Sequence, residues 1–173
     1  MIDQPTRVLI VMRHAEAQSM ARSDHERALT PNGMADALDM GRWLARQRYV
    51  PQSALVSSAL RAQETWAQAS RGGGWSEQIG KSTSQLYDAG PWDALALIGA
   101  TDPGVRILMV VGHNPTMAAL AYGLDDGLAD EAVVAVRNAG MSPATAVVFQ
   151  CRHEWTELAE GSARVLASYR GLS

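Results

Sequence analysis

Short apolar runs alternate with longer segments of helical periodicity along most of the chain. The first run covers residues 8–12, and a run of the same kind lies within 105–111. Uninterrupted runs of this type are typical of parallel strands that are buried on both faces of a sheet. Shorter strand-like runs follow at 54–58, 82–89, 131–137 and 144–151.

Helical segments separate these runs. Residues 31–47 are expected to form a helix, because Thr30 is a good N-cap, Pro31 suits the first helical position and an apolar stripe follows. Further helices are expected over residues 59–70, with a break at the glycines after Arg71, from about Pro91, and from about Pro115.

This alternation predicts an α/β fold. We expect a three-layer α/β/α sandwich with a mostly parallel sheet, folded as a single domain over residues 1–173. The core of this domain is expected at about 7–150, followed by a polar C-terminal tail at 151–173.

Composition narrows the class of protein. Hydrophobic residues make up 47% of the 173, charged residues 19%, and the formal net charge is −3, which gives no basic face for nucleic acid. No apolar run approaches the roughly 18 residues that span a bilayer, so we expect no membrane association. Because Cys151 is the only cysteine and the first residues lack signal-peptide features, a cytoplasmic location is expected.

Polar residues gather where three of the predicted strands end. Arg13 and His14 follow the first strand, Arg61 follows the strand at 54–58, and His113 follows the run at 105–111. Ligands of open α/β sheets bind beyond the carboxyl ends of the strands. Two arginines and two histidines at this edge predict a site for a dianion, since the arginine fork donates two hydrogen bonds to phosphate oxygens and a neutral imidazole is a competent nucleophile.

Three segments that carry these residues resemble the histidine phosphatase superfamily, also called phosphoglycerate-mutase-like. They read RHAEA at 13–17, SSALRAQET at 57–65 and GHNPTM at 112–117, and they occur in the family's order. The resemblance runs from about residue 8 to residue 149. LTPNG at 29–33 and the lack of the mutases' long insertions resemble the SixA-like phosphohistidine phosphatase branch.

The resemblance implies a role for each of these residues. His14 would be the phospho-accepting nucleophile, and Arg13, Arg61 and His113 would surround the phosphoryl group. Larger members have a glutamate in an L-x-E pattern as the proton donor. The pattern reads Leu-Tyr-Asp at 86–88 here, so Asp88 is the candidate donor, with a shorter reach.

Several further residues are open to two interpretations. Ser58 and Asn114 are candidates for phosphate binding, but each could instead cap the helix that follows. The segment 24–27 could line the entrance to the site or form a solvated face, and His25 and His153 are expected at the surface. Because no His-x-His, HExxH or clustered carboxylate pattern occurs, we expect no metal and no cofactor.

These features favour a metal-independent phosphatase that forms a covalent phosphohistidine on His14. The expected substrate is phosphohistidine in a signalling protein, such as a histidine phosphotransfer domain. Two alternatives stay open: a phosphatase for a small phosphorylated metabolite, and a non-catalytic module that binds a phosphorylated partner.

Overall fold

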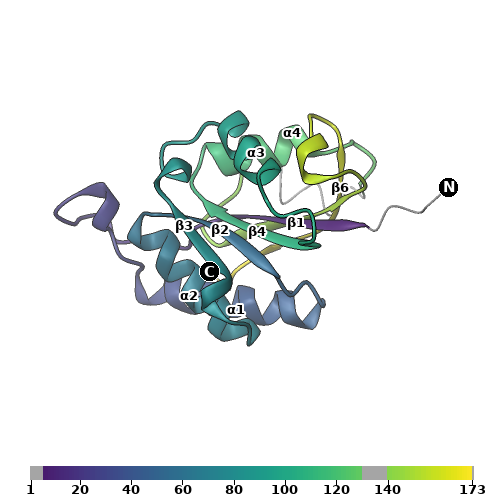
Figure 1. Cartoon of the computed structure of the whole chain (residues 1–173). Coiled ribbons are helices and arrows are strands. Elements are labelled where there is room, and N and C mark those ends of the chain that lie inside the picture. Colours follow the sequence, from purple (N-terminus) through teal and green to yellow (C-terminus); the bar gives the residue numbers. More distant parts are fainter. Residues whose placement is uncertain (1–5, 130–139, 173) are drawn as a thin grey trace.

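Six strands form one sheet at the centre of the molecule (Figure 1), in the order β3-β2-β4-β1-β5-β6. The computed structural model describes residues 6–129 and 140–172. The four strands β1, β2, β3 and β4 run parallel to one another, whereas β5 is antiparallel to both of its neighbours, β1 and β6. The bounds of the strands are Arg7–Arg13 for β1, Ser53–Ser57 for β2, Gly80–Thr83 for β3, Ile107–Gly112 for β4, Thr145–Cys151 for β5 and Ala163–Arg170 for β6.

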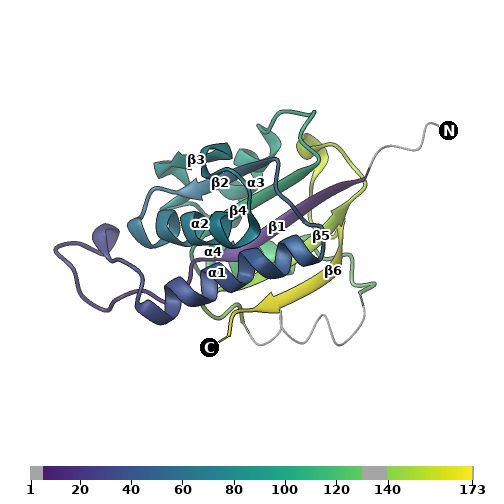
Figure 2. The same cartoon turned by 90° about the horizontal axis from the view of Figure 1, so that it is seen from below.

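Helices cover both faces of the sheet, which confirms the three-layer α/β/α arrangement in a single domain. Figure 2, seen from below, shows α1 and α2 in front of the sheet, while α3 and α4 lie on the far face. The bounds of the helices are Pro31–Arg46 for α1, Leu60–Gly73 for α2, Pro91–Gly99 for α3 and Thr116–Leu124 for α4; the 3-10 turns are Asp24–Glu26 (η1), Glu77–Ile79 (η2), Ser84–Leu86 (η3) and Trp155–Glu157 (η4).

Burial on both faces explains the unbroken apolar run of β1. Leu9 and Val11 pack with α3 and α4, whereas Ile10 and Met12 pack with α1 and α2. Because successive side chains of a strand point to opposite faces, a strand covered on both sides needs an apolar residue at every position. The run in β4 has the same cause.

Helix α1 begins where the sequence predicts it. The Thr30 side chain accepts a hydrogen bond from the backbone N–H of Gly33 at 3.0 Å, and Pro31 is the first helical residue. A Cβ at Gly33 would lie 2.1 Å from the carbonyl oxygen of Glu16, so this position requires glycine. The LTPNG segment thus packs the start of α1 against the loop that follows β1.

Four expectations from the sequence need comment. A break was expected at the glycines after Arg71, but helix α2 continues through Gly73. Gly74, which has a left-handed backbone (φ 74°), caps its end. Strand β3 covers only 80–83 and is followed by η3, whereas a strand was expected over 82–89. The polar tail after 151 is not an appendage, because it contributes β6; the run at 131–137 lies outside the described residues.

The register of the parallel strands brings the candidate residues to one edge. Arg13 pairs with Gly112, so the residues after β1 and β4 leave the sheet side by side, and β2 lies next to β4. The antiparallel β5 begins at this same edge, where the backbone N–H of Ala144 donates to the carbonyl of His14 at 3.1 Å. Over the described residues, no helix combines the length and hydropathy that crossing a membrane requires.

Candidate active site

The loop after β1 holds His14 by contacts with three other segments. The backbone N–H of His14 donates to the carbonyl of Gly112 at 2.9 Å, and its own carbonyl accepts from Ala144. The next residue, Ala15, donates its N–H to the hydroxyl of Thr65 on α2 at 3.0 Å. The main chain of His14 is therefore fixed by β4, β5 and α2 together.

The His14 ring is buried, with 8% of the residue exposed, and its Nδ1 lies 2.7 Å from the carbonyl oxygen of Ala15. Since a carbonyl only accepts, Nδ1 carries the proton and Nε2 keeps its lone pair. Burial is the main cause that lowers the pKa of His14 to about 4, and the charges of Arg61 and Arg13 lower it further. His14 is thus neutral at pH 7, with one nucleophilic nitrogen.

His113, which follows β4, lies against His14, with ring centroids 5.1 Å apart. Its Nε2 is 2.7 Å from Oγ of the fully buried Ser57, and Oγ also accepts from the backbone N–H of Ala59 at 3.4 Å. Burial and the neighbouring His14 lower the pKa of His113 to about 3, so the ring is neutral. Because Oγ already accepts from Ala59, we assign the hydroxyl as the donor to Nε2, and this assignment makes Nδ1 the protonated nitrogen of His113.

Arg61, near the start of α2, is buried and binds Asp24 through both terminal nitrogens. Nη1 donates to the Asp24 carbonyl at 2.7 Å and Nη2 to its carboxylate at 2.9 Å. The same carboxylate accepts from Arg27 Nε at 2.9 Å and from the Tyr87 hydroxyl at 2.7 Å. The η1 turn is thereby joined to α2 and to the segment after η3.

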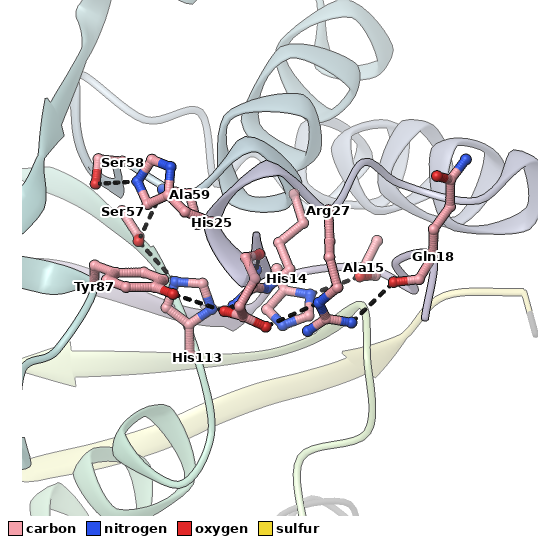
Figure 3. Close-up of polar contacts among 12 residues, drawn as sticks. His14, Ala15, Gln18, His25, Arg27, Ser57, Ser58, Ala59, Tyr87 and His113 are labelled. Carbon is pink, nitrogen blue, oxygen red and sulfur yellow. Dashed lines mark hydrogen bonds and ion pairs between the residues drawn. The ribbon is translucent and has the colours of Figure 1, made fainter. Parts of the chain in front are cut away.

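The Tyr87 ring contacts His113, Arg61 and His25. Its ring meets that of His113 edge-on, with centroids 5.6 Å apart, and the Arg61 guanidinium lies over it at 6.0 Å. His25 packs edge-on against the other side of Tyr87, at 5.0 Å, and its Nε2 bonds Oγ of Ser58 at 2.9 Å. Figure 3 shows the side chains of Tyr87, His113, His14 and Arg27 gathered in one region.

Three buried nitrogens in this region have no hydrogen-bond partner among the described residues. They are Nε of Arg13, Nε of Arg61 and Nδ1 of His113. An unpaired buried donor is unfavourable by about 1–3 kcal/mol, so several in one place require an explanation. Because all three belong to side chains next to His14 and two are cationic, they fit the oxygens of an anion such as a phosphoryl group.

The structure brings Arg13, His14, Arg61 and His113 together, as the strand ends predict. Asp88 lies elsewhere: it is exposed and lines a surface depression with Gln85, on the side of η3 that faces α3. Its neighbour Tyr87 faces the site instead. Both residues directly follow the one-turn helix η3.

The two residues left open in the sequence have other partners. Asn114 donates through Nδ2 to the carbonyl of Met141 at 2.8 Å and accepts from the N–H of Ala118 at 3.3 Å, so it stabilises α4. The Met141 carbonyl also accepts from Arg13 at 2.9 Å. Ser58 makes no capping bond to α2, whose N-cap is Ala59, and its hydroxyl binds His25.

Sequence reasoning missed Ser57, Tyr87 and the role of Asp24. Ser57 is the last residue of a strand next to β4, and this position alone could have indicated it. Asp24 and Tyr87 are 63 positions apart, and no local pattern connects them. Within the described part of the chain, no three histidine, cysteine or acidic side chains are grouped as metal ligands would be.

Comparisons with known proteins agree with this geometry. No family model matches the chain. The chain is 31% identical over 157 residues to the uncharacterized protein Rv1276c of Mycobacterium tuberculosis, covering 90% of this chain and 96% of that protein. It is 31% identical over 124 residues to the phosphohistidine phosphatase SixA of Escherichia coli, covering 69% of this chain and 74% of SixA.

A solved structure resembles the whole molecule. The protein assigned as the phosphohistidine phosphatase SixA of Nakamurella multipartitia superposes with a TM-score of 0.80 at 27% identity, covering 97% of this chain and 98% of that one. Mycobacterial glucosyl-3-phosphoglycerate phosphatase shares the fold, with a TM-score of 0.65 at 16% identity, covering 94% and 98% of the two chains.

Proposed function

The chain belongs to the SixA-like branch of the histidine phosphatase superfamily and is a hydrolase of that superfamily, and we propose that it removes phosphoryl groups from phosphohistidine through a covalent intermediate on His14. The single observation that carries the proposal is the His14 ring: buried, neutral, and with Nδ1 bonded to a carbonyl so that Nε2 is free to attack. Pure phosphate binding would not require a nucleophile held in this state.

The first step transfers the phosphoryl group to the enzyme. Nε2 of His14 attacks phosphorus while the bond from phosphorus to the leaving nitrogen breaks, and that electron pair goes to the leaving ring. The unpaired N–H groups of Arg13, Arg61 and His113 would hold the three equatorial oxygens. Water then attacks the phosphohistidine, His14 Nε2 regains its lone pair, and phosphate leaves with the oxygen and protons of the water.

The leaving-group side supports phosphohistidine over an alkyl ester. An ester needs a proton donor for its departing oxygen, and the only carboxyl bonded into the site by a described contact is Asp24. The hydrogen bond from Tyr87, with those from Arg61 and Arg27, holds the pKa of Asp24 well below its usual range, so it is a poor acid. An imidazole protonated by solvent leaves without such a donor.

The partner that fits this proposal is a phosphorylated protein, and a histidine phosphotransfer domain is the class we favour. The similarity to the SixA protein of Escherichia coli supports this choice. We further propose that the protein acts in the cytoplasm, where such partners are found, and that it needs no metal because Arg13 and Arg61 supply the positive charge.

Hydrolysis assays test the proposal. Wild type, His14→Ala and His153→Ala would be given a phosphotransfer domain phosphorylated on histidine and, separately, p-nitrophenyl phosphate, both with a chelator present. We expect turnover by wild type and by His153→Ala, whose exposed side chain makes no described contact with the site, and none by His14→Ala.

Trapping identifies the attacking residue. After an alkaline quench, which preserves phosphohistidine, trypsin releases residues 14–22, whose single histidine is His14. A phosphate on this peptide is the expected result. Turnover by His14→Ala would overturn the mechanism, and tight binding of the phosphorylated domain with no turnover would favour the binding module instead.

A further inference from the structure

Asp24 is the one carboxylate held directly against the phosphoryl-binding groups by the described contacts, and neither the mechanism above nor the strand-end pattern gives it a role. Its Oδ2 accepts from Arg61 and Tyr87, and its Oδ1 accepts from Arg27. Three segments thus fix its position. A carboxylate offers about four acceptor positions, so one stays available.

Asp24 lies on the outer side of the site. The side chain of Arg61 is 6% exposed, whereas that of Asp24, its ion-pair partner, is 55% exposed. His14 is only 8% exposed and lies deeper in the site. In an in-line displacement the leaving atom departs opposite the nucleophile, so a leaving group displaced by the buried His14 is expected to depart toward solvent, where Asp24 is the exposed carboxylate of the site.

The described contacts of Asp24 leave three buried donors of the site unpaired. Asp24 uses only the two terminal nitrogens of Arg61, and Nε of Arg61 stays unpaired, as do Nε of Arg13 and Nδ1 of His113. These are the donors that the mechanism requires. A carboxylate that blocked the site would be expected to occupy them.

We propose that Asp24 is a specificity residue that accepts a hydrogen bond from the protonated ring of a phosphohistidine leaving group and disfavours leaving groups that depart as oxyanions. The proposal rests on the proposed function and refines its substrate class. The ring takes a proton from solvent on the nitrogen that does not carry phosphorus, and this N–H faces Asp24. When the P–N bond breaks, its electron pair goes to the ring nitrogen that carried the phosphorus. The ring then leaves as neutral imidazole, still protonated on the nitrogen that faces Asp24.

The same carboxylate acts against an aryl or alkyl phosphate. Negative charge then develops on the departing oxygen beside an ionised Asp24, which is unfavourable. The surrounding groups keep Asp24 ionised, because Arg61 and Arg27 bind it and Tyr87 donates to it. Of the two neighbouring rings, that of His113 is neutral and that of His25 is exposed.

The test compares two substrates in Asp24→Asn, with Glu26→Gln as the matched control. Asparagine keeps an oxygen acceptor for Arg61 and Tyr87 but removes the charge. Glu26 lies in the same η1 turn and bonds only Ser23 among the described contacts, so its variant reports charge removal away from the site. The substrates are N-phosphoimidazole and p-nitrophenyl phosphate.

We expect kcat/KM of Asp24→Asn to fall at least about tenfold on N-phosphoimidazole and to rise on p-nitrophenyl phosphate, with Glu26→Gln like wild type on both. The alkaline limb of the N-phosphoimidazole pH profile should also move to lower pH in Asp24→Asn, because the ring loses the carboxylate that favours its protonation. A merely structural role would lower both rates together and leave this limb in place.

Each other outcome overturns a separate statement. Equal losses on both substrates would make Asp24 a structural clamp for Arg61. If kcat/KM of Asp24→Asn rose equally on both substrates and inorganic phosphate inhibited more tightly, Asp24 would be a group that competes with the substrate for the site. Either result refutes the inference while His14-dependent turnover by wild type continues, whereas loss of that dependence refutes the proposed function itself.

Discussion

Replacing Ser57 by alanine removes the group that sets the proton position on His113. Ser57 is fully buried, its Oγ lies 2.7 Å from Nε2 of His113, and no described residue forms a hydrogen bond with Nδ1 of that ring. Without the hydroxyl, Nε2 has no partner, and the proton no longer has a reason to stay on Nδ1. The variant is therefore expected to lose the Nδ1–H that would bind a phosphoryl oxygen.

The size of the effect follows from burial. A buried polar atom left without its partner is unfavourable by about 1–3 kcal/mol. If the loss is expressed in the transition state, each 1.4 kcal/mol lowers the rate about tenfold, so kcat/KM should fall by about 5- to 150-fold. Inhibition by inorganic phosphate should weaken in the same direction, because the product uses the same donor.

The assay combines kinetics, stability and ring spectra. Steady-state hydrolysis of N-phosphoimidazole gives kcat/KM, and urea unfolding measures the fold separately. The matched control is Ser70→Ala, a serine on α2 that is also buried but whose Oγ has no partner among the described residues. It should keep wild-type kcat/KM. Nitrogen NMR of His113 should report Nδ1–H in the wild type and a mixture of tautomers in Ser57→Ala.

Two results would refute this reasoning. Wild-type kcat/KM in Ser57→Ala would mean that the hydroxyl does not govern His113. A lower rate with His113 still protonated on Nδ1 would mean that the alanine acts on something else, such as the start of α2.

Three further predictions follow from the site. Asp88→Asn should change kcat/KM on N-phosphoimidazole less than about twofold, because this carboxyl lies in a separate surface depression; a loss comparable to that of Arg61→Lys would restore it as the proton donor. Arg61→Lys should lower kcat/KM by about 10²-fold or more in steady-state assays, since lysine lacks both the fork and Nε; a change under tenfold would contradict this. The pKa values of His14 and His113, about 4 and 3, lie below that of unfolded histidine, about 6.5, so the unfolded chain binds more protons in between. The free energy of unfolding by urea should therefore fall as pH decreases from 6.5 to 4, and less so in a double His→Gln variant of these two residues; equal falls would contradict the prediction.

The fold and the position of the candidate nucleophile are predictable because both follow from local patterns. The apolar runs of β1 and β4 reflect burial on both faces, and strand ends are where such a sheet presents polar side chains. Arg13, His14 and His113 could thus be placed at one edge from the sequence. The sixth strand could not, since its outer side is partly exposed and its residues, such as Arg164 and Ser168, lack an apolar run.

The leaving-group side was not predictable for a different reason. Tyr87 and Asp24 meet only because the η1 turn and the residues after η3 fold over the same edge of the sheet. Neither position has a periodicity that marks it. Tyr87 rather than Asp88 faces the site, and the expected strand over 82–89 did not anticipate the one-turn helix η3 that directly precedes them.

Residues at the strand ends and residues in the turns have different parts in the proposed reaction, which suggests how one fold can act on different phosphorylated substrates. In the proposed mechanism His14, Arg61 and His113 act on the phosphoryl group itself. His14 and His113 follow strands that are buried on both faces, and Arg61 lies near the start of α2. In the same proposal the leaving group meets Asp24 and Tyr87, which come from short turns and contact each other through their side chains. Neither residue belongs to the hydrophobic core, so substituting them is expected to leave the core intact. Changes in such turns would alter which leaving groups are accepted, while the residues around the phosphoryl group stay in place.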